Sequence, residues 1–402
     1  ELNGGCVAIG CARVMSNSLT AMVNNTENDF FEGVEKLLEV WFTRKDGKIN
    51  NCDLRKLTRD QLESLMVVAK CEIISSSSTE HIDGYVLSES SMFISARRFI
   101  LKTCGNTTPL TCLPMLLTFV SITTGFDTVQ DLYYSRKNFK RPELQLTPHR
   151  TFADEAQMLD DMFNSGKAYC MGSVNRADCW YLYTYSYNPA KLPLALRCSN
   201  IMPPNNNTNN SVTKANNVMK TGNAGFILGA RNMMNQPHEN DQTLEVLMSN
   251  LDREKMSCFY KANCTNAAEA TKLAGIDELI PGTVIDDVLF TPCGYSMNGL
   301  LRNIPGGYMT IHITPEPDFS YVSFETNIPQ SSYKKLIGKV IECFGPKQFI
   351  ITFFNSCSSG VQLGAEDGCR VPKYKDYNVN DLQICQLPNY DLTYALYNRT
   401  PS

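Results

Sequence analysis

Ser90 stands in a segment, Tyr85-Val-Leu-Ser-Glu-Ser-Ser-Met-Phe93, whose residues could cut their own backbone. A serine hydroxyl lies one carbon from its own amide nitrogen, so it can attack the preceding carbonyl, here that of Glu89, through a five-membered ring. If the backbone is strained, the amide rearranges to an ester, and a base can then remove the serine α-proton. Elimination frees the Glu89 carboxylate and leaves a dehydroalanine, which becomes an imine and hydrolyses to a pyruvoyl group. Taken alone, Ser-Glu-Ser-Ser is also typical of a polar turn.

His312 lies in an alternating run, Thr310-Ile-His-Ile-Thr-Pro-Glu-Pro317. If this run is a strand, His312, Thr314 and Glu316 share one face and the isoleucines face the other way. Imidazole titrates near neutrality, so a histidine on a polar face suits a general base. A single strand histidine can also be a surface or satisfied core residue. Metal binding is disfavoured because no second histidine or cysteine stands at ligand spacing.

Carboxylates from distant parts of the chain form a further candidate set. We expect Asp241 and Glu245 to share a helix face, because they stand four apart in residues 241–251, where the spacing predicts a helix. Glu39 and Glu325 fall on predicted strands. Exposed carboxylates are the simpler interpretation, since buried anions are costly unless a cation compensates them.

The segments around Ser90 and His312 occur with two others, Arg98-Phe-Ile-Leu-Lys-Thr-Cys-Gly105 and Pro292-Cys-Gly-Tyr-Ser-Met-Asn-Gly299. Together they resemble the eukaryotic S-adenosylmethionine decarboxylases, in one order from about Phe30 to about Phe354. The resemblance implies a proenzyme that cuts itself and uses the pyruvoyl group from Ser90, without metal or pyridoxal phosphate. That group would form a Schiff base with S-adenosylmethionine and release CO2, giving the aminopropyl donor for spermidine and spermine.

The resemblance also implies roles that residue types alone leave open. His312 would be the processing base, Ser296 a hydrogen-bonding partner in processing, and Cys104 the proton donor in decarboxylation. A strand cysteine is otherwise more often an apolar filler. For the substrate, the implied residues are Phe31 and Phe290 around adenine, the backbone at Leu87 and Glu89 at its edge, and Glu316 at the ribose hydroxyls.

A buried site for putrescine is implied as well, where a diamine dication would compensate the acidic set. Its members would be Glu39, Lys102, Arg136, Asp241, Thr243, Glu245 and Glu325. We expect putrescine to stimulate processing or turnover.

Bulk composition limits the other function classes. The chain has 402 residues, 43% of them hydrophobic, and a net charge of −4, so it can bury a large core and has no strong field for nucleic acid or an anionic membrane. The apolar stretch 110–120 is too short for a membrane span and predicts a buried helix. Sixteen cysteines and several glycosylation sequons raise the alternative of a secreted, glycosylated structural protein. The absence of C-x-x-C pairs and the chain length favour reduced thiols in the cytosol.

Periodicity predicts a mixed α+β chain. Expected helices are 59–70, 109–122, 154–164, 241–251 and 331–344, and expected strand regions are 35–42, 83–103, 168–187, 308–325 and 348–355. The resemblance implies a four-layer αββα sandwich, two antiparallel sheets packed face to face with helices outside. We expect residues 1–28 to be a mobile tail and 29–395 one catalytic domain, cut into 1–89 and 90–402, with a disordered Asn-rich insertion at about 188–240.

Two further points follow from the resemblance. A non-catalytic relative that acts as a binding or activating partner is the main alternative, and the retained Ser90, Cys104, Ser296 and His312 argue against it. Relatives include dimers and monomers, so a homodimer of two-chain protomers is one of two expected assemblies.

Overall fold

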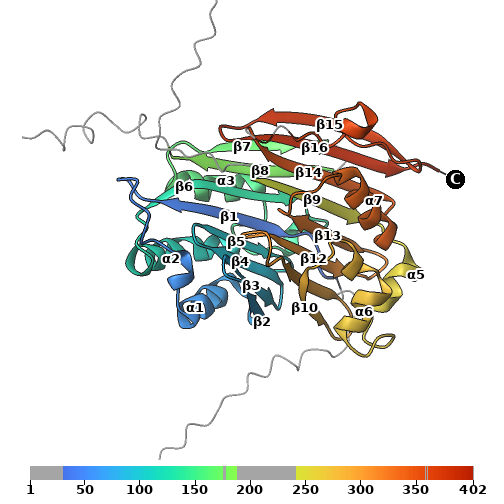
Figure 1. Ribbon diagram of the computed structural model, residues 1–402, viewed down its shortest axis with the longest axis horizontal. Helices are drawn as coiled ribbons and strands as arrows, with labels where there is room; N and C mark the ends of the chain where they lie inside the picture. Colours follow the sequence, from blue (N-terminus) through green and yellow to red (C-terminus); the bar gives the residue numbers. More distant parts are fainter. Residues whose placement is uncertain (1–29, 175–177, 188–240, 358, 360, 402) are drawn as a thin grey trace, which may run out of the picture. The chain divides into compact units, whose positions relative to one another are not determined.

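The computed structural model describes residues 30–174, 178–187, 241–357, 359 and 361–401 (Figure 1). Residues 32–402 form one compact unit, separate from residues 1–31. The expected tail at 1–28 and the expected insertion at 188–240 lie outside the described residues.

Two eight-stranded antiparallel sheets make up the centre of this unit (Figure 1). The first sheet has the order β2-β3-β4-β5-β1-β6-β8-β7, and the second has the order β10-β11-β12-β13-β9-β14-β16-β15. Each strand of the second sheet therefore occupies the place of the strand eight positions earlier in the first, so the topology is duplicated.

The strands of the first sheet are β1 (Lys36–Thr43), β2 (Ile73–Ser78), β3 (Ile82–Leu87), β4 (Ser90–Ser95), β5 (Arg98–Thr103), β6 (Thr128–Lys137), β7 (Lys167–Met171) and β8 (Trp180–Ser186). Those of the second are β9 (Gln242–Ser249), β10 (Val284–Leu289), β11 (Tyr295–Leu300), β12 (Tyr308–Thr314), β13 (Tyr321–Thr326), β14 (Gln348–Ser356), β15 (Tyr377–Gln386) and β16 (Tyr390–Arg399).

Helices cover the outer face of each sheet. The first sheet carries α1 (Arg59–Ala69), α2 (Pro109–Thr123) and α3 (Phe152–Met162), and the second carries α5 (Arg253–Met256), α6 (Ala267–Leu273) and α7 (Tyr333–Phe344). Each outer layer has its own apolar core, and a third cluster joins strands of both sheets between them. The four-layer αββα sandwich is thus confirmed.

Local sequence explains where the longer helices begin and end. Thr58 and Gln61 form a reciprocal capping box at the start of α1. Ser332 accepts a hydrogen bond from the Lys335 amide at the start of α7, and Gly345 ends that helix in the left-handed region at φ +58°. The helices predicted at 59–70, 109–122, 154–164 and 331–344 are confirmed to within a few residues. Among the described residues, no helix has both the length and the apolar character needed to cross a membrane.

The helix predicted at 241–251 is wrong, because this segment contains strand β9. A central strand covered on both faces is apolar along most of its length, so periodicity alone does not distinguish it from a buried helix. Leu244, Val246 and Met248 pack in the outer core. Asp241, Thr243 and Glu245 still share a face, but through the two-residue period of a strand.

The layer between the sheets is where polar residues gather. Strand pairing brings His312 of β12 beside Ser296 of β11 on one side and Ser323 of β13 on the other. Glu325 of β13 similarly lies opposite Glu245 of β9. Apolar residues surround this polar strip, so its charges are held away from water.

Candidate active site

The Glu89–Ser90 bond lies at a tight hairpin between β3 and β4. Leu87 pairs with Ser90, so Ser88 and Glu89 alone form the turn. Ser90 is buried and has a φ of +110°. A residue with a β-carbon rarely adopts such a φ, and its conformational cost must be offset by the surrounding structure. The expected cleavage bond is therefore next to local backbone strain.

A backbone hydrogen bond polarises the carbonyl on the other side of this bond. The amide N–H of Cys104 donates to the carbonyl oxygen of Glu89 over 3.2 Å. Pairing of Ser90 with Thr103, the last residue of β5, places Cys104 there. Lys36 donates to the carbonyl of Gly105 over 2.8 Å, which anchors the following residue. A donor on this oxygen would stabilise negative charge that develops when the carbonyl is attacked.

The Cys104 side chain faces the same turn. Its thiol lies 3.9 Å from Glu89 Oε2. Burial, reinforced by the Glu89 carboxylate, raises the pKa of the Cys104 thiol well above its usual value. Burial also raises the pKa of Glu89 to about 7, although Lys36 opposes the shift. The thiol thus keeps its proton near neutral pH, as a proton donor must.

His312 is held by a carboxylate that we did not predict as a site residue. Its Nδ1 lies 2.5 Å from Glu35 Oε1, and its Nε2 lies 2.7 Å from Ser91 Oγ. Ser90 Oγ donates to the same Glu35 oxygen over 3.4 Å. Within the described part of the chain, the hydrogen bonds of His312 do not include one to Ser90. Glu35 therefore connects the residue to be modified with the predicted base.

The charge on Glu35 is maintained despite burial. Burial alone would raise the pKa of Glu35, but the charges of Lys102 and His312 and a hydrogen bond from His312 lower it to about 2. An ionised carboxylate at Nδ1 fixes the imidazole ring orientation and leaves Nε2 toward Ser91. The sequence carried one signal for Glu35, since it precedes β1 on the face shared by Glu39.

Ser91 and Asn298 are further site residues that we did not predict. Ser91 Oγ lies 2.6 Å from Asn298 Oδ1, and Thr310 Oγ1 donates to the same Asn298 oxygen over 3.1 Å. Asn298 lies two residues after Ser296 in β11, on the same face. Ser296 is buried and pairs with His312 between the neighbouring strands β11 and β12.

The predicted substrate residues are partly brought together. Glu316 lies beyond the end of β12 at Thr314, so the expectation that it continues the strand face is wrong. Its Oε2 is buried and has no hydrogen-bond partner among the described residues. Half-buried Phe290 lies just after β10 and donates its amide hydrogen to Gly294 over 2.9 Å. Phe31 belongs to the separate unit at 1–31, so its place relative to these residues is not described.

Lys102 is the centre of the acidic cluster. Its Nζ lies 2.8 Å from Glu325, 3.0 Å from Glu245 and 3.6 Å from Glu35. Burial would lower the pKa of Lys102, but these carboxylates raise it well above its usual value. Burial raises the pKa of Glu245. The Lys102 ammonium group thus forms ion pairs with three buried carboxylates. One of them is Glu35, which also contacts His312, so Lys102 connects the acidic cluster to His312.

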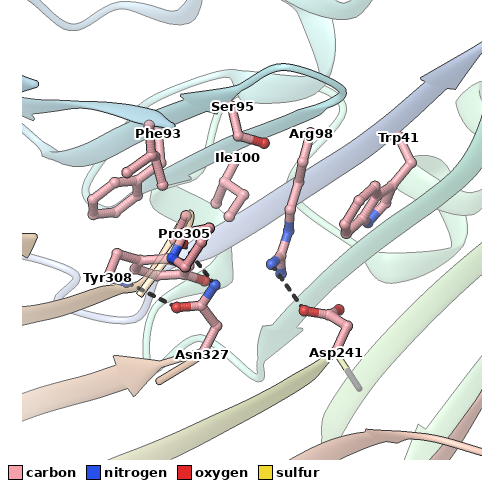
Figure 2. Close-up of a pocket in the computed structure, with 11 residues that line it drawn as sticks. Trp41, Phe93, Ser95, Arg98, Ile100, Asp241, Pro305, Tyr308 and Asn327 are labelled. Atoms are coloured by element: carbon pink, nitrogen blue, oxygen red, sulfur yellow. Dashed lines mark hydrogen bonds and ion pairs between the residues drawn. The ribbon is translucent and has the colours of Figure 1, made fainter. Parts of the chain in front are cut away.

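Arg98 holds the other predicted acidic residues. Its guanidinium lies 2.7 Å from Glu39 and 3.6 Å from Asp241, and it donates to Thr243 over 3.3 Å. Figure 2 shows Arg98 pointing toward Asp241, with Trp41 and Tyr308 on either side of it. These residues line a cavity of about 160 Å³. Lys102 and Arg98 face five carboxylates in all: Glu35, Glu39, Asp241, Glu245 and Glu325. This excess of carboxylates suits an additional cation.

The structure does not bring Arg136 to the acidic cluster. Arg136 points to the helix-covered face of the first sheet, where its Nε lies 2.8 Å from Glu155 of α3. The guanidinium also stacks over Phe139 at 4.2 Å. Even-numbered positions of β6 face the helices, and Tyr133 faces the other sheet. Arg98 occupies the place expected for this basic neighbour.

Comparison with known proteins fits this geometry. A family model described as adenosylmethionine decarboxylase matches residues 28–398. The chain belongs to the adenosylmethionine decarboxylase family. The S-adenosylmethionine decarboxylase proenzyme of Drosophila melanogaster is 45% identical over 372 residues, which cover 92% of this chain and 96% of the relative. The Xenopus laevis proenzyme is 41% identical over 368 residues, covering 92% and 95%.

A solved structure of the family shares the fold. The Trypanosoma brucei AdoMetDC-delta26 monomer aligns with a TM-score of 0.51 at 21% sequence identity, covering 77% of this chain and 99% of that chain. Within the described residues, no three or more histidine, cysteine, aspartate or glutamate side chains group where they could hold a metal ion. The cysteines in that same part of the chain are free thiols.

Proposed function

We propose that this protein is an S-adenosylmethionine decarboxylase proenzyme that cuts itself between Glu89 and Ser90. The observation that carries the proposal is the strained Ser90, at φ +110°, in a turn whose Glu89 carbonyl accepts the Cys104 amide. Membership of the family and the similarity to proenzymes over most of the chain support it. The products are residues 1–89 and 90–402, and 29–395 is one catalytic domain.

The self-cutting reaction needs only residues of this chain and water. Ser90 Oγ loses its proton and bonds to the Glu89 carbonyl carbon. The bond between that carbon and the Ser90 nitrogen then breaks, the nitrogen takes up a proton, and Glu89 is left joined to Ser90 by an ester. His312 removes the α-proton of Ser90, and the Glu89 carboxylate leaves with the electron pair of its bond to the serine β-carbon. The dehydroalanine becomes an imine, water adds, and ammonia departs. Glu35 orients the imidazole for this step, since its carboxylate is 2.5 Å from Nδ1.

Decarboxylation then depends on the new carbonyl. When formed, the pyruvoyl group supplies an electron-accepting carbonyl for the substrate amine. Cys104 returns a proton to the substrate carbon that has lost CO2. The raised pKa of the Cys104 thiol, and its position 3.9 Å from Glu89 Oε2 beside the cleavage turn, support this role. Ser296, opposite His312 in the sheet, holds the processing intermediate by a hydrogen bond.

Substrate binding uses the groups beside the turn. Glu316 accepts the two ribose hydroxyls, and its unpartnered, buried Oε2 supports this role. Phe290 stacks on one face of the adenine, and the backbone at Leu87 and Glu89 contacts its edge.

Putrescine is the proposed activator at the acidic cluster. A dication would join Lys102 and Arg98 in compensating five carboxylates. Because Lys102 lies 3.6 Å from Glu35, a change in the charge around Glu245 and Glu325 reaches the partner of His312. This connection supports an effect on processing or turnover.

We also propose a cytosolic location and a homodimer of two-chain protomers. The free thiols within the described residues support a reducing compartment. The outermost strand β15 leaves Val379, Leu382 and Ile384 exposed, which supports pairing at this edge. The non-catalytic alternative is not favoured, because Ser90, Cys104 and His312 are all held in one site.

The test is the release of labelled CO2 from carboxyl-labelled S-adenosylmethionine. The wild-type chain is expected to release it, and Ser90→Ala is expected to remain uncut and inactive. Ser88→Ala, in the same turn, is the matched control and should keep both cutting and activity. Activity in the Ser90→Ala variant would overturn the proposed function.

A further inference from the structure

Lys36, the first residue of β1, is a fully buried lysine close to the cleavage turn. It pairs with Thr103 of β5, and Thr103 pairs with Ser90 of β4. The three residues therefore lie in one row across neighbouring strands. Lys36 shares the helix-covered face of the first sheet with Leu38, two residues further along the strand. A buried ammonium is costly, so its place in this row calls for a function.

The Lys36 ammonium holds the segment that faces the cleavage turn. Its Nζ donates to the Gly105 carbonyl over 2.8 Å. The preceding residue, Cys104, donates its amide hydrogen to the Glu89 carbonyl over 3.2 Å. Gly105 has a φ of +57°, so the chain turns directly after Cys104. Lys36 thus fixes the position of the residue whose amide contacts the carbonyl that Ser90 attacks.

The charge of this ammonium is not compensated by its hydrogen-bond partners. Besides the Gly105 carbonyl, Lys36 Nζ donates to Gln145 Oε1 over 2.9 Å, and both acceptors are neutral. Nζ also lies 5.2 Å from the centre of the Phe139 ring. Burial lowers the pKa of Lys36 to about 8, although Cys104 opposes the shift. The ammonium therefore keeps a positive charge available at neutral pH.

Carboxylates near Lys36 have other partners. Glu155 pairs with Arg136 and His149, each at 2.8 Å, and Glu32 accepts two backbone hydrogens of residues 140–141 over 2.8 and 3.2 Å. Burial raises the pKa of Glu89 to about 7, and the charge of Lys36 opposes this shift. The titratable and charged groups that act on Lys36 or respond to it are Glu32, Glu89, Cys104, Arg136, His149 and Glu155.

Self-cutting creates a new anion at the turn. When the bond between Ser90 Oγ and its β-carbon breaks, the electron pair leaves with the main-chain carboxylate of Glu89, and the Ser90 α-proton goes to His312. In the uncut chain this position holds a neutral carbonyl, and the adjoining Ser90 is only 1% exposed. A carboxylate that forms away from water is costly unless a cation is near.

We propose that Lys36 is a positioning residue for self-cutting: through Gly105 it holds the Cys104 amide against the Glu89 carbonyl, and it supplies positive charge to the carboxylate that leaves Ser90. This role rests on the proposed self-cutting reaction. Position and charge can be separated by substitution. A glutamine can still donate a hydrogen bond but has no charge, whereas an arginine keeps both.

The rate at which the 90–402 chain appears at neutral pH tests this role. Lys36→Gln and Lys36→Met should each slow cutting about tenfold or more, and Lys36→Arg should stay within about fivefold of wild type. The slowed Lys36→Gln chain should also accumulate the ester, which hydroxylamine splits between residues 89 and 90. Lys335→Gln, at an exposed position of α7, is the matched control and should cut as wild type does.

Two results of this experiment would overturn the role of Lys36 alone: cutting of Lys36→Gln at the wild-type rate, or slow cutting of Lys36→Gln without accumulated ester. Both are distinct from a wild-type chain that never cuts, which would remove the proposed function itself.

The pH dependence of cutting in the wild-type chain does not depend on any variant folding. The Lys36 ammonium is present below its pKa of about 8 and is lost above it, so the rate should fall as pH rises through that value. The fall should be absent in Lys36→Arg, because a guanidinium keeps its charge. Glu89 and Cys104 titrate in both chains, so the difference between the profiles reports Lys36. A wild-type rate that does not fall, or an equal fall in Lys36→Arg, would overturn the proposal.

Discussion

Glu35 and His312 lie 2.5 Å apart in the layer between the two sheets, and Ser90 donates a hydrogen bond to the same carboxylate oxygen. This relationship joins the serine at the expected cleavage bond to the expected base through one buried anion. It also places that anion within 3.6 Å of Lys102, the centre of the acidic cluster.

Glu35→Gln is expected to slow self-cutting by about tenfold or more. The amide keeps the shape of the side chain but loses the charge that orients the imidazole ring of His312. The measurement is the rate at which the 90–402 chain appears after synthesis. Glu63→Gln, at an exposed position of α1, is the control, and an unchanged rate in Glu35→Gln would remove Glu35 from the mechanism.

Cys104→Ala is expected to separate cutting from decarboxylation. The backbone N–H that contacts Glu89 remains in this variant, so cutting should stay within a few-fold of wild type. The lost proton donor should lower kcat by about 100-fold. Both effects can be followed in one preparation by gel and by CO2 release. Unimpaired turnover would show that the thiol is not the donor.

Asp241→Asn is expected to weaken the response to putrescine. It removes one carboxylate from the five that face Arg98 and Lys102, so the half-saturating putrescine concentration should rise about tenfold. The titration follows cutting or CO2 release. Glu342→Gln, at an exposed position of α7, should respond as wild type does. An unaltered titration in Asp241→Asn would contradict the proposed activator site.

Arg136→Gln is expected to reduce stability without altering the putrescine response. The change removes the guanidinium from the buried carboxylate of Glu155, which keeps only His149 and the Tyr134 hydroxyl, so the free energy of unfolding should fall by about 3 kcal/mol. Denaturant unfolding measures this loss. If the putrescine titration shifts strongly while the free energy of unfolding is unchanged, Arg136 belongs to the activator site and this prediction is wrong.

Burial of Glu89 gives the uncut chain a pH-dependent stability. Its pKa is raised from about 4.5 to about 7 in the folded state, so the folded chain holds a proton between these values that the unfolded chain has lost. Stability from this group is complete below pH 4.5 and is lost as pH rises through 7. The loss is at most about 3 kcal/mol.

Denaturant unfolding of Ser90→Ala between pH 4.5 and 7.5 checks this effect. The free energy of unfolding should fall less with rising pH when Glu89→Gln is added to the same chain. Parallel pH profiles for the two variants would show that Glu89 is not responsible.

Period-two alternation was enough to predict strand β1 and the inward face that carries Glu39. Strand alternation also places Arg98 on the same face of β5 as Lys102, whereas Arg136 faces the helices. It would therefore have predicted Arg98, and not Arg136, as the second cation of the acidic cluster. The strand at β9 could not be separated from a helix, because both of its faces are buried. The φ of Ser90 and the contact between Glu35 and His312 depend on pairing between distant segments, which single-sequence patterns do not determine.

Intact-mass analysis of the purified protein under denaturing conditions tests the central claim most directly. The account predicts two chains that separate between Glu89 and Ser90, the second lacking a free amino terminus. Their masses should sum to that of the uncut chain plus one water and minus one ammonia. A single continuous chain in a preparation that releases CO2 from S-adenosylmethionine would contradict the account.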